Sequence, residues 1–142
     1  MKKELLIGLS PNSKLIKEYK KQLTSLNTIQ WEASIGLMLG DASLQTQNKG
    51  KTYRMKFEWS EKNKAYVYHI YALFDEWVLS KPHVKNRLSP KGNSVTNLGF
   101  QTISHKAFNS LAELFFKKNE NDKLDTKKSI NSLLIKNHLW RL

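Results

Sequence analysis

Apolar residues recur every three or four positions in several segments of the chain, which is the spacing of an α-helix with one buried face. The spacing predicts helices over residues 14–27, 30–40, 62–79 and 104–118. Ser13 stands where a cap is expected before the first helix, and Pro82 stops the third. The second segment, QWEASIGLMLG, is apolar on nearly every side, so we expect it to be covered on more than one face.

Strict alternation of apolar and polar residues marks residues 52–59, TYRMKFEW, as a β-strand with one side in a core and one basic side in water. Further strands are expected over residues 43–48, 83–88 and 94–102. The turns NKGK and PKG join the strands as two hairpins. The stretch KKNENDKLDTKK is expected to be a polar loop, and residues 129–139 a last short helix.

This order of elements predicts an α+β fold with a four-stranded antiparallel sheet. A length of 142 residues with 39% hydrophobic residues suits one domain with a packed core. We divide it into an N-terminal arm and helix (1–29), a central domain (30–118), and a polar loop with a C-terminal helix (119–142).

The composition excludes several classes of function. Without cysteine the chain has no disulfide framework, no thiolate zinc site and no cysteine nucleophile. Its four histidines are scattered without the spacing of zinc ligands. Neither a bilayer-spanning apolar run nor a secretion signal is present, so we expect no membrane partner.

The charge is large and unevenly distributed. Lysine and arginine number 24 against 12 acidic residues, a net charge of +12 that favours a polyanionic partner. No acid occurs between Asp41 and Glu58 or between Glu76 and Glu113, although lysines and arginines do. A lysine-rich, AT-rich genome would also raise the total charge, but it would not explain why two long segments contain no acidic residue. We therefore expect a basic face that binds nucleic acid.

The second apolar segment ends in SIGLMLGDAS, which combines two small residues with one carboxylate. Gly36 and Gly40 are four apart and share a helical face, where small residues let another backbone approach closely. Asp41 then lies near the negative end of the helix dipole, where an anion is unfavourable unless a cation such as Mg²⁺ joins it. The alternative is that Asp41 only opens the following turn.

The sequence EASIGLMLGDASL resembles the LAGLIDADG motif of the homing endonucleases, in particular the group I intron enzymes of fungal mitochondria. PNSKLIKEYKKQL, GKTYRMKFEWSEKNKAY, DEWVLSKPH and QTISHKAFNSLAELF resemble the N-terminal half of the two-motif, I-SceI-type members. The resemblance covers most of residues 11–137. It implies a single LAGLIDADG domain, α-β-β-α-β-β-α, whose four-stranded, saddle-shaped sheet lies in the DNA major groove.

The resemblance also implies roles for individual residues. Asp41 stands where the family's catalytic, metal-binding carboxylate stands, which makes Mg²⁺ the expected cofactor of a catalytic protein. Gly36 and Gly40 match the helix-packing interface, and Lys128 matches more loosely a basic residue near the active site. Alternation along the strands gives the expected nucleic-acid-binding residues: Gln45, Gln47, Lys49, Arg54, Lys56, Lys85, Arg87, Asn97 and Gln101. Arginine and glutamine there would read base edges, and lysine would hold phosphate; each basic residue taken singly is equally well explained as a solvated surface side chain.

The sequence contains one such motif where the similar enzymes have two, and one Asp41 cannot build a site that cuts two strands. We therefore expect a half-length nucleic-acid-binding protein that does not cut as a monomer. In the favoured interpretation the fold is reused for RNA binding, as a component of an organellar ribosome or as an intron maturase. The alternative is a homodimeric, Mg²⁺-dependent, site-specific DNA homing endonuclease; a decaying intron reading frame is a third possibility. Expected partners are DNA or structured RNA and either a second copy or a larger ribonucleoprotein, in mitochondria or another organelle.

Overall fold

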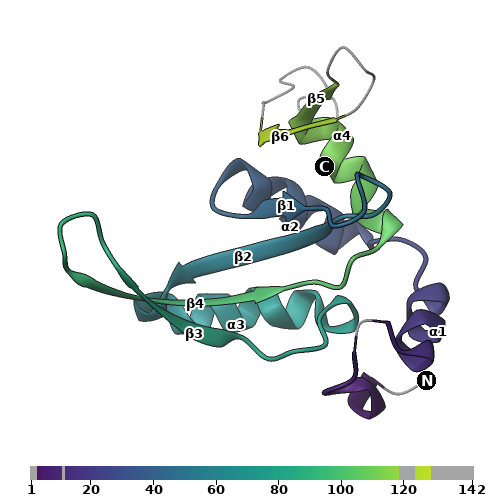
Figure 1. Ribbon diagram of the computed structural model, residues 1–142, viewed down its shortest axis with the longest axis horizontal. Helices are drawn as coiled ribbons and strands as arrows, with labels where there is room; N and C mark the ends of the chain where they lie inside the picture. Colours follow the sequence, from purple (N-terminus) through teal and green to yellow (C-terminus); the bar gives the residue numbers. More distant parts are fainter. Residues whose placement is uncertain (1–2, 11, 119–123, 129–142) are drawn as a thin grey trace. The chain divides into compact units, whose positions relative to one another are not determined.

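The computed structural model describes residues 3–10, 12–118 and 124–128, in which helices and strands follow one another in the order of an α+β protein (Figure 1). The helices are α1 (Lys14–Gln22), α2 (Thr28–Leu39), α3 (Lys64–Leu73) and α4 (Asn109–Phe115). The strands are β1 (Ser43–Gln45), β2 (Arg54–Ser60), β3 (His83–Leu88), β4 (Ser94–Gln101), β5 (Phe116–Lys118) and β6 (Leu124–Lys128). The expected fold class is confirmed. In the part of the chain described, no helix is long and apolar enough to cross a bilayer.

The principal sheet has the strand order β1-β2-β4-β3, and a separate two-stranded sheet pairs β5 with β6. Within the principal sheet β1 pairs antiparallel with β2, with Gln45 opposite Arg54 and Ser43 opposite Lys56. The β3–β4 hairpin is also antiparallel and runs from the pair His83–Gly99 to the pair Leu88–Ser94. These registers determine which side chains share a face, because side chains alternate along each strand.

The chain forms two compact units. The first unit comprises Met1–Ser25 and Phe57–Ile103, and the second comprises Leu26–Lys56 and Ser104–Leu142. Strand β2 therefore contributes its N-terminal half to the second unit and its C-terminal half to the first.

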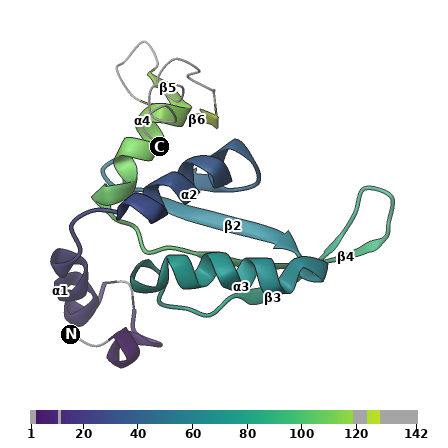
Figure 2. The ribbon, with the colours of Figure 1, turned by 180° about the vertical axis from the view of Figure 1, so that it is seen from behind.

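In the first unit α3 runs along the β3–β4 hairpin, as two opposite views show (Figures 1 and 2). Its inward side chains, Val67 and Ile70, are buried with Phe57, Trp77 and Phe100. Near the N-terminus, Leu6, Ile16 and Tyr19 form a further buried cluster. The Tyr19 hydroxyl donates to the backbone carbonyl of Glu76, and burial, followed by the nearby Glu76, Asp75 and Glu4 carboxylates, raises the pKa of this tyrosine.

In the second unit α2 and α4 pack around side chains that strand β2 turns inward. Ile35, Met38, Met55, Leu111 and Phe115 are all at most 1% exposed. Helix α2 begins with a capping box, in which the Asn27 side chain accepts from the Gln30 backbone and the Gln30 side chain accepts from the Asn27 backbone. This box places the helix start two residues before the predicted one.

The third predicted helix is shorter than the pattern indicated. Helix α3 ends at Leu73, and a single 3₁₀ turn at Asp75–Trp77 replaces its expected last part. Phe74, Trp77 and Val78 are all buried, as the predicted apolar stripe requires, although the α-helix ends before them. The predicted cap at Ser13 is confirmed, since its hydroxyl accepts from the Ile16 backbone at 3.3 Å.

Two loop and strand boundaries also differ from those predicted. Strand β1 ends at Gln45 because the Thr46 and Asn48 side chains bond to the backbone of Gly50 and Thr52 and form a polar turn instead. The stretch expected to be a polar loop carries β6, and the expected helix over 104–118 gives way to strand at Phe116. The short helix predicted over 129–139 lies outside the described residues.

Candidate nucleic-acid interface

In the second unit, Gln45 and Arg54 form a polar contact between β1 and β2. They lie opposite each other in the hairpin, and Arg54 donates through Nε (3.2 Å) and Nη2 (3.1 Å) to the Gln45 amide oxygen. Both side chains are half-buried, whereas the alternate residues Leu44 and Met55 are buried. The predicted alternation is thus present, and the amide holds the guanidinium in one orientation while leaving its charge intact.

Lys56 continues the same side of β2 and lies opposite Ser43. Its side chain is half-buried. Gln47 and Lys49 do not belong to the strand. They are exposed in the polar turn after β1, where Lys49 has a positive φ of 60°.

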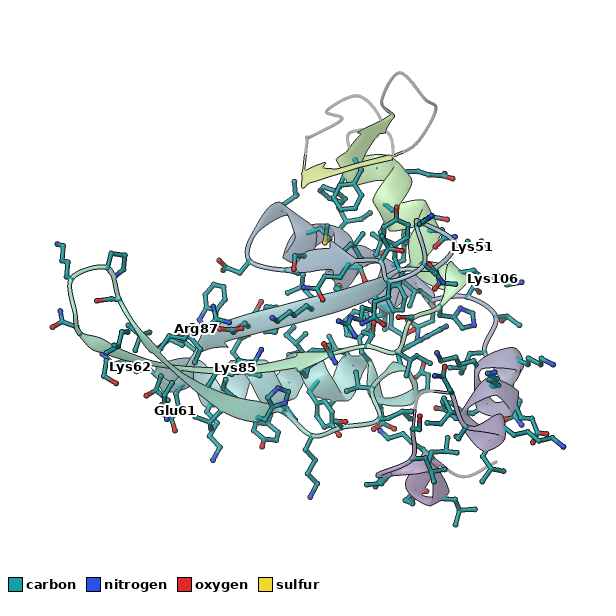
Figure 3. The ribbon with its side chains drawn as sticks, viewed as in Figure 1. Lys51, Glu61, Lys62, Lys85, Arg87 and Lys106 are labelled. Atoms are coloured by element: carbon teal, nitrogen blue, oxygen red, sulfur yellow. The ribbon has the colours of Figure 1, made fainter. Side chains whose placement is uncertain are left out.

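In the first unit, the carboxylate of Glu58 contacts three of the predicted binding residues. Asn97 Nδ2 donates to Glu58 Oε1 at 2.9 Å, and Arg87 Nη2 donates to Glu58 Oε2 at 3.2 Å. Lys85 Nζ lies 3.9 Å from the same Oε2. Lys85 is the direct β-partner of Asn97, so the four side chains share one face of the β2–β4–β3 strands. Figure 3 labels Lys85 and Arg87 on the β3–β4 ribbon. We call these four residues the Glu58 cluster.

The close approach of β4 to β2 beside the Glu58 cluster depends on Gly99. A Cβ at this position would lie 2.6 Å from the Phe57 carbonyl oxygen and 3.1 Å from the Glu58 Cα. No side chain fits there without moving a backbone. Gln101, two residues further along β4, is exposed at the strand end.

The motif at the end of α2 has an open side. A Cβ on Gly36 would meet nothing within 4 Å, and Leu39, Gly40 and Asp41 are exposed. At the N-terminal end of the helix, Ile29 is also exposed. Gly36 therefore has open space at the position where the resemblance implies a close helix contact, and that contact stays a prediction.

Asp41 supplies one carboxylate at the C-terminal end of this helix. Among residues 3–10, 12–118 and 124–128, no three His, Cys, Asp or Glu side chains come together as a metal site would need. Within these described residues Asp41 thus fits as a single ligand of a divalent metal. Lys128 ends β6, and the placement of its side chain is outside the description.

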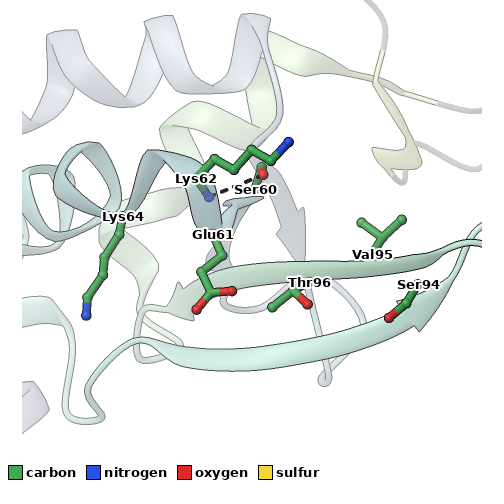
Figure 4. A pocket seen from close by; sticks show the side chains of 7 residues that line it. All are labelled: Ser60, Glu61, Lys62, Lys64, Ser94, Val95 and Thr96. Atoms are coloured by element: carbon green, nitrogen blue, oxygen red, sulfur yellow. Dashed lines mark hydrogen bonds between the residues drawn. The ribbon is translucent and has the colours of Figure 1, made fainter.

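The alternation of polar and apolar residues placed Glu58 on the polar side of a strand but did not indicate its contacts with Asn97, Arg87 and Lys85. Its signal was available: Glu58 is the one acid in an alternating strand whose other outward residues are Thr52, Arg54 and Lys56. The same unit has an open hollow, lined by Ser60, Glu61, Lys62, Lys64, Ser94, Val95 and Thr96 (Figure 4). The Lys62 and Lys64 side chains point away from each other there, so they do not converge on one anion.

Comparison with known proteins gives consistent matches. Residues 31–140 match the model of the LAGLIDADG DNA endonuclease family. A probable intron-encoded endonuclease 1 of Wickerhamomyces canadensis is 47% identical over 120 residues, which cover 81% of this chain and 51% of the relative. The solved structure of the homing endonuclease I-WcaI bound to its DNA recognition sequence matches with a TM-score of 0.75 and 46% identity, over 82% of this chain and 50% of that one.

These relatives overturn the favoured functional interpretation. The chain was expected to be reused for RNA binding, but the relatives are named as an intron-encoded endonuclease and as a homing endonuclease in complex with DNA. The prediction of RNA binding was wrong because a basic sheet face attracts either polyanion and carries no signal of its own that separates them. The chain spans about half the length of both relatives.

Proposed function

This chain belongs to the LAGLIDADG DNA endonuclease family, and we propose that it is one repeat of a site-specific DNA homing endonuclease. The observation that carries the proposal is the match to a homing endonuclease solved on its DNA recognition sequence, at 46% identity over 82% of this chain. A relationship this close over both hairpins makes the same mode of DNA binding the simplest expectation.

The basic faces of the two hairpins supply what DNA binding requires. Arg54 and Lys56 in the second unit and Lys85 and Arg87 in the first provide cations for phosphates. Gln45, Asn97 and the arginines also carry the planar donor and acceptor groups that recognise base edges in the major groove. Together the two hairpins thus supply groups that attract the backbone and groups that distinguish bases.

Cutting would require a second LAGLIDADG repeat, and we propose a second copy of this chain in that place. Asp41 would then be one of two carboxylates, one from each repeat. A bound Mg²⁺ would polarise a phosphate and activate water. The exposed side of α2, with Gly36 and Gly40, would form the contact between the repeats.

The test uses the purified chain and two duplexes, one with the recognition sequence found in the I-WcaI complex and one with the same bases scrambled. We expect binding to both and tighter binding to the first. With Mg²⁺, cleavage should rise with the square of protein concentration, because each copy supplies one Asp41. Asp41→Asn should abolish cleavage without weakening binding, whereas Glu61→Gln, which also removes one exposed carboxylate, should leave cleavage unchanged. Absence of binding to either duplex, or cleavage that persists in Asp41→Asn, would contradict the proposal.

A further inference from the structure

We infer that Glu58 is a positioning residue of the DNA interface, which holds Asn97 and Arg87 in the orientation that reads bases and restrains their attraction to phosphate. The inference rests on the proposed function, because it describes how that interface is arranged before DNA binds. Nothing in the similarity to known endonucleases assigns this role.

Glu58 is placed to orient neighbouring side chains of the protein. Its side chain is 15% exposed, whereas that of Arg87 is 55% exposed. Both carboxylate oxygens are engaged, Oε1 by the Asn97 amide and Oε2 by Arg87, with Lys85 also near Oε2. A glutamate that read a base directly would accept from a cytosine amino group. Glu58 has its acceptors turned toward its own neighbours instead, so the groups that face outward are those of Asn97 and Arg87.

Glu58 determines which end of the Asn97 amide faces outward. An ionised carboxylate only accepts hydrogen bonds, so the amide nitrogen must point toward Glu58. The Asn97 oxygen and its second N–H are left for a ligand. An unrestrained asparagine could turn either end outward and would pair with more than one kind of base edge. The carboxylate removes that choice and so contributes to discrimination without touching DNA.

The charge of Glu58 acts in the same direction. Lys85 and Arg87 bring two positive charges, and one carboxylate beside them offsets part of their attraction for any phosphate. Removing the carboxylate would therefore have two effects of opposite sign: binding to arbitrary DNA would strengthen, and the preference for the correct sequence would fall. Removal of a merely structural residue would weaken binding to both.

The experiment compares the parent chain with Glu58→Gln and with the matched control Glu61→Gln. A glutamine at position 58 keeps one acceptor oxygen and turns the other into a donor, so it no longer supplies separate acceptors to Asn97 and Arg87. Glu61 carries the same charge and lies three residues from Glu58 in the sequence. It lines the open hollow and is not part of the Glu58 cluster. The probes are the duplex most enriched by the parent chain from a randomised library and a scrambled duplex of the same composition. Affinities are measured at fixed salt, and urea unfolding confirms that each variant is folded.

We expect Glu58→Gln to bind the scrambled duplex about twofold more tightly and to lose at least about fivefold in the ratio of selected to scrambled affinity, the lower end of the discrimination that a good base contact provides. Glu61→Gln should shift both affinities together and leave the ratio unchanged. In an Asn97→Ala, Arg87→Ala background, Glu58→Gln should no longer change the ratio, because the groups through which it acts are gone.

Two outcomes would overturn the inference while the proposed function stands. One is a parent chain that discriminates strongly and a Glu58→Gln variant whose ratio stays within twofold of it. The other is a Glu58→Gln variant that loses affinity equally for both duplexes, which is the behaviour of a fold-supporting residue. If the parent chain itself prefers no sequence, the proposed function fails, and the inference fails with it.

Discussion

Arg54 and Arg87 occupy outward positions on strands, yet their immediate partners differ in charge. In the second unit Arg54 donates twice to the neutral amide of Gln45. In the first unit Arg87 donates to the carboxylate of Glu58, which Lys85 and Asn97 also approach. An amide orients a guanidinium and leaves its charge available. A carboxylate orients it and also cancels part of its long-range field.

The difference suggests that the two regions have different roles in DNA binding. The Gln45–Arg54 pair has the properties of a group that attracts the DNA backbone, because its full positive charge is held in place at little electrostatic cost. The Glu58 cluster has the properties of a group that distinguishes bases, because it combines fixed donors and acceptors with a reduced net charge. A protein that must find one site among many needs both kinds of contact.

The largest effect should come from the glycine that brings β4 against β2. Gly99→Ala would force its Cβ against the Phe57 carbonyl and should lower the free energy of unfolding by about 1–3 kcal/mol. It should also reduce sequence discrimination, since it moves Asn97 relative to Glu58. Gly36→Ala is the matched control: its Cβ meets nothing within 4 Å, and it should raise stability by up to about 1 kcal/mol. Urea unfolding measures both, and equal effects would show that the close approach is not a constraint.

The next largest effect should be a difference in DNA affinity between variants of Arg54 and of Arg87. Arg54→Ala should weaken binding to a scrambled duplex about fivefold to tenfold near 0.1 M salt, as expected when one phosphate is no longer neutralised. Arg87→Ala should cost only about twofold, because Glu58 already offsets its charge. In a Glu58→Gln background, however, Arg87→Ala should cost about fourfold, because the twofold gain from removing the Glu58 charge depends on Arg87. Fluorescence anisotropy over a salt series measures these differences, and equal reductions in affinity in the parent background would remove the distinction between the regions.

A smaller effect should follow when the amide beside Arg54 is replaced by a carboxylate like the one beside Arg87. Gln45→Glu would place a carboxylate beside Arg54, as Glu58 lies beside Arg87, and should make the salt dependence of non-specific binding shallower by up to about 0.9 in the log–log slope. Gln47→Glu adds the same charge in the exposed turn after β1, away from the Arg54 contact, and should change the slope less. Indistinguishable slopes for the two variants would mean that position does not matter, only net charge.

Much of the fold could be predicted because its signals are local. Strand β3 begins and ends where the alternation and Pro82 indicated, and the Ser13 cap lies where it was expected. The early end of α3 was not predictable, since Phe74, Trp77 and Val78 have the i, i+3, i+4 spacing that a continued helix would also bury. The early end of β1 comes from side-chain bonds to the backbone, which compete with strand pairing and leave no trace in periodicity.

The candidate interface was predictable in part for the same reason. Alternation placed Arg54, Lys85 and Arg87 on outward positions, and the hairpin register then brings Gln45 opposite Arg54. The Glu58–Asn97 contact joins residues 39 positions apart on strands that are not consecutive, so only the strand order reveals it. The choice between DNA and RNA was beyond composition altogether, because both present the same phosphate charge.

If these strand faces bind DNA, the salt dependence of binding must depend on the charges that the strands carry. The measurement compares the parent chain with two variants that each lose four positive charges: Arg54, Lys56, Lys85 and Arg87 to alanine, and the exposed Lys14, Lys17, Lys21 and Lys62 to alanine. We expect a log–log slope shallower by about 3 for the first variant and nearly unchanged for the second. Equal slopes for the two variants would contradict DNA binding by these faces, because the charge would then act without regard to the strands.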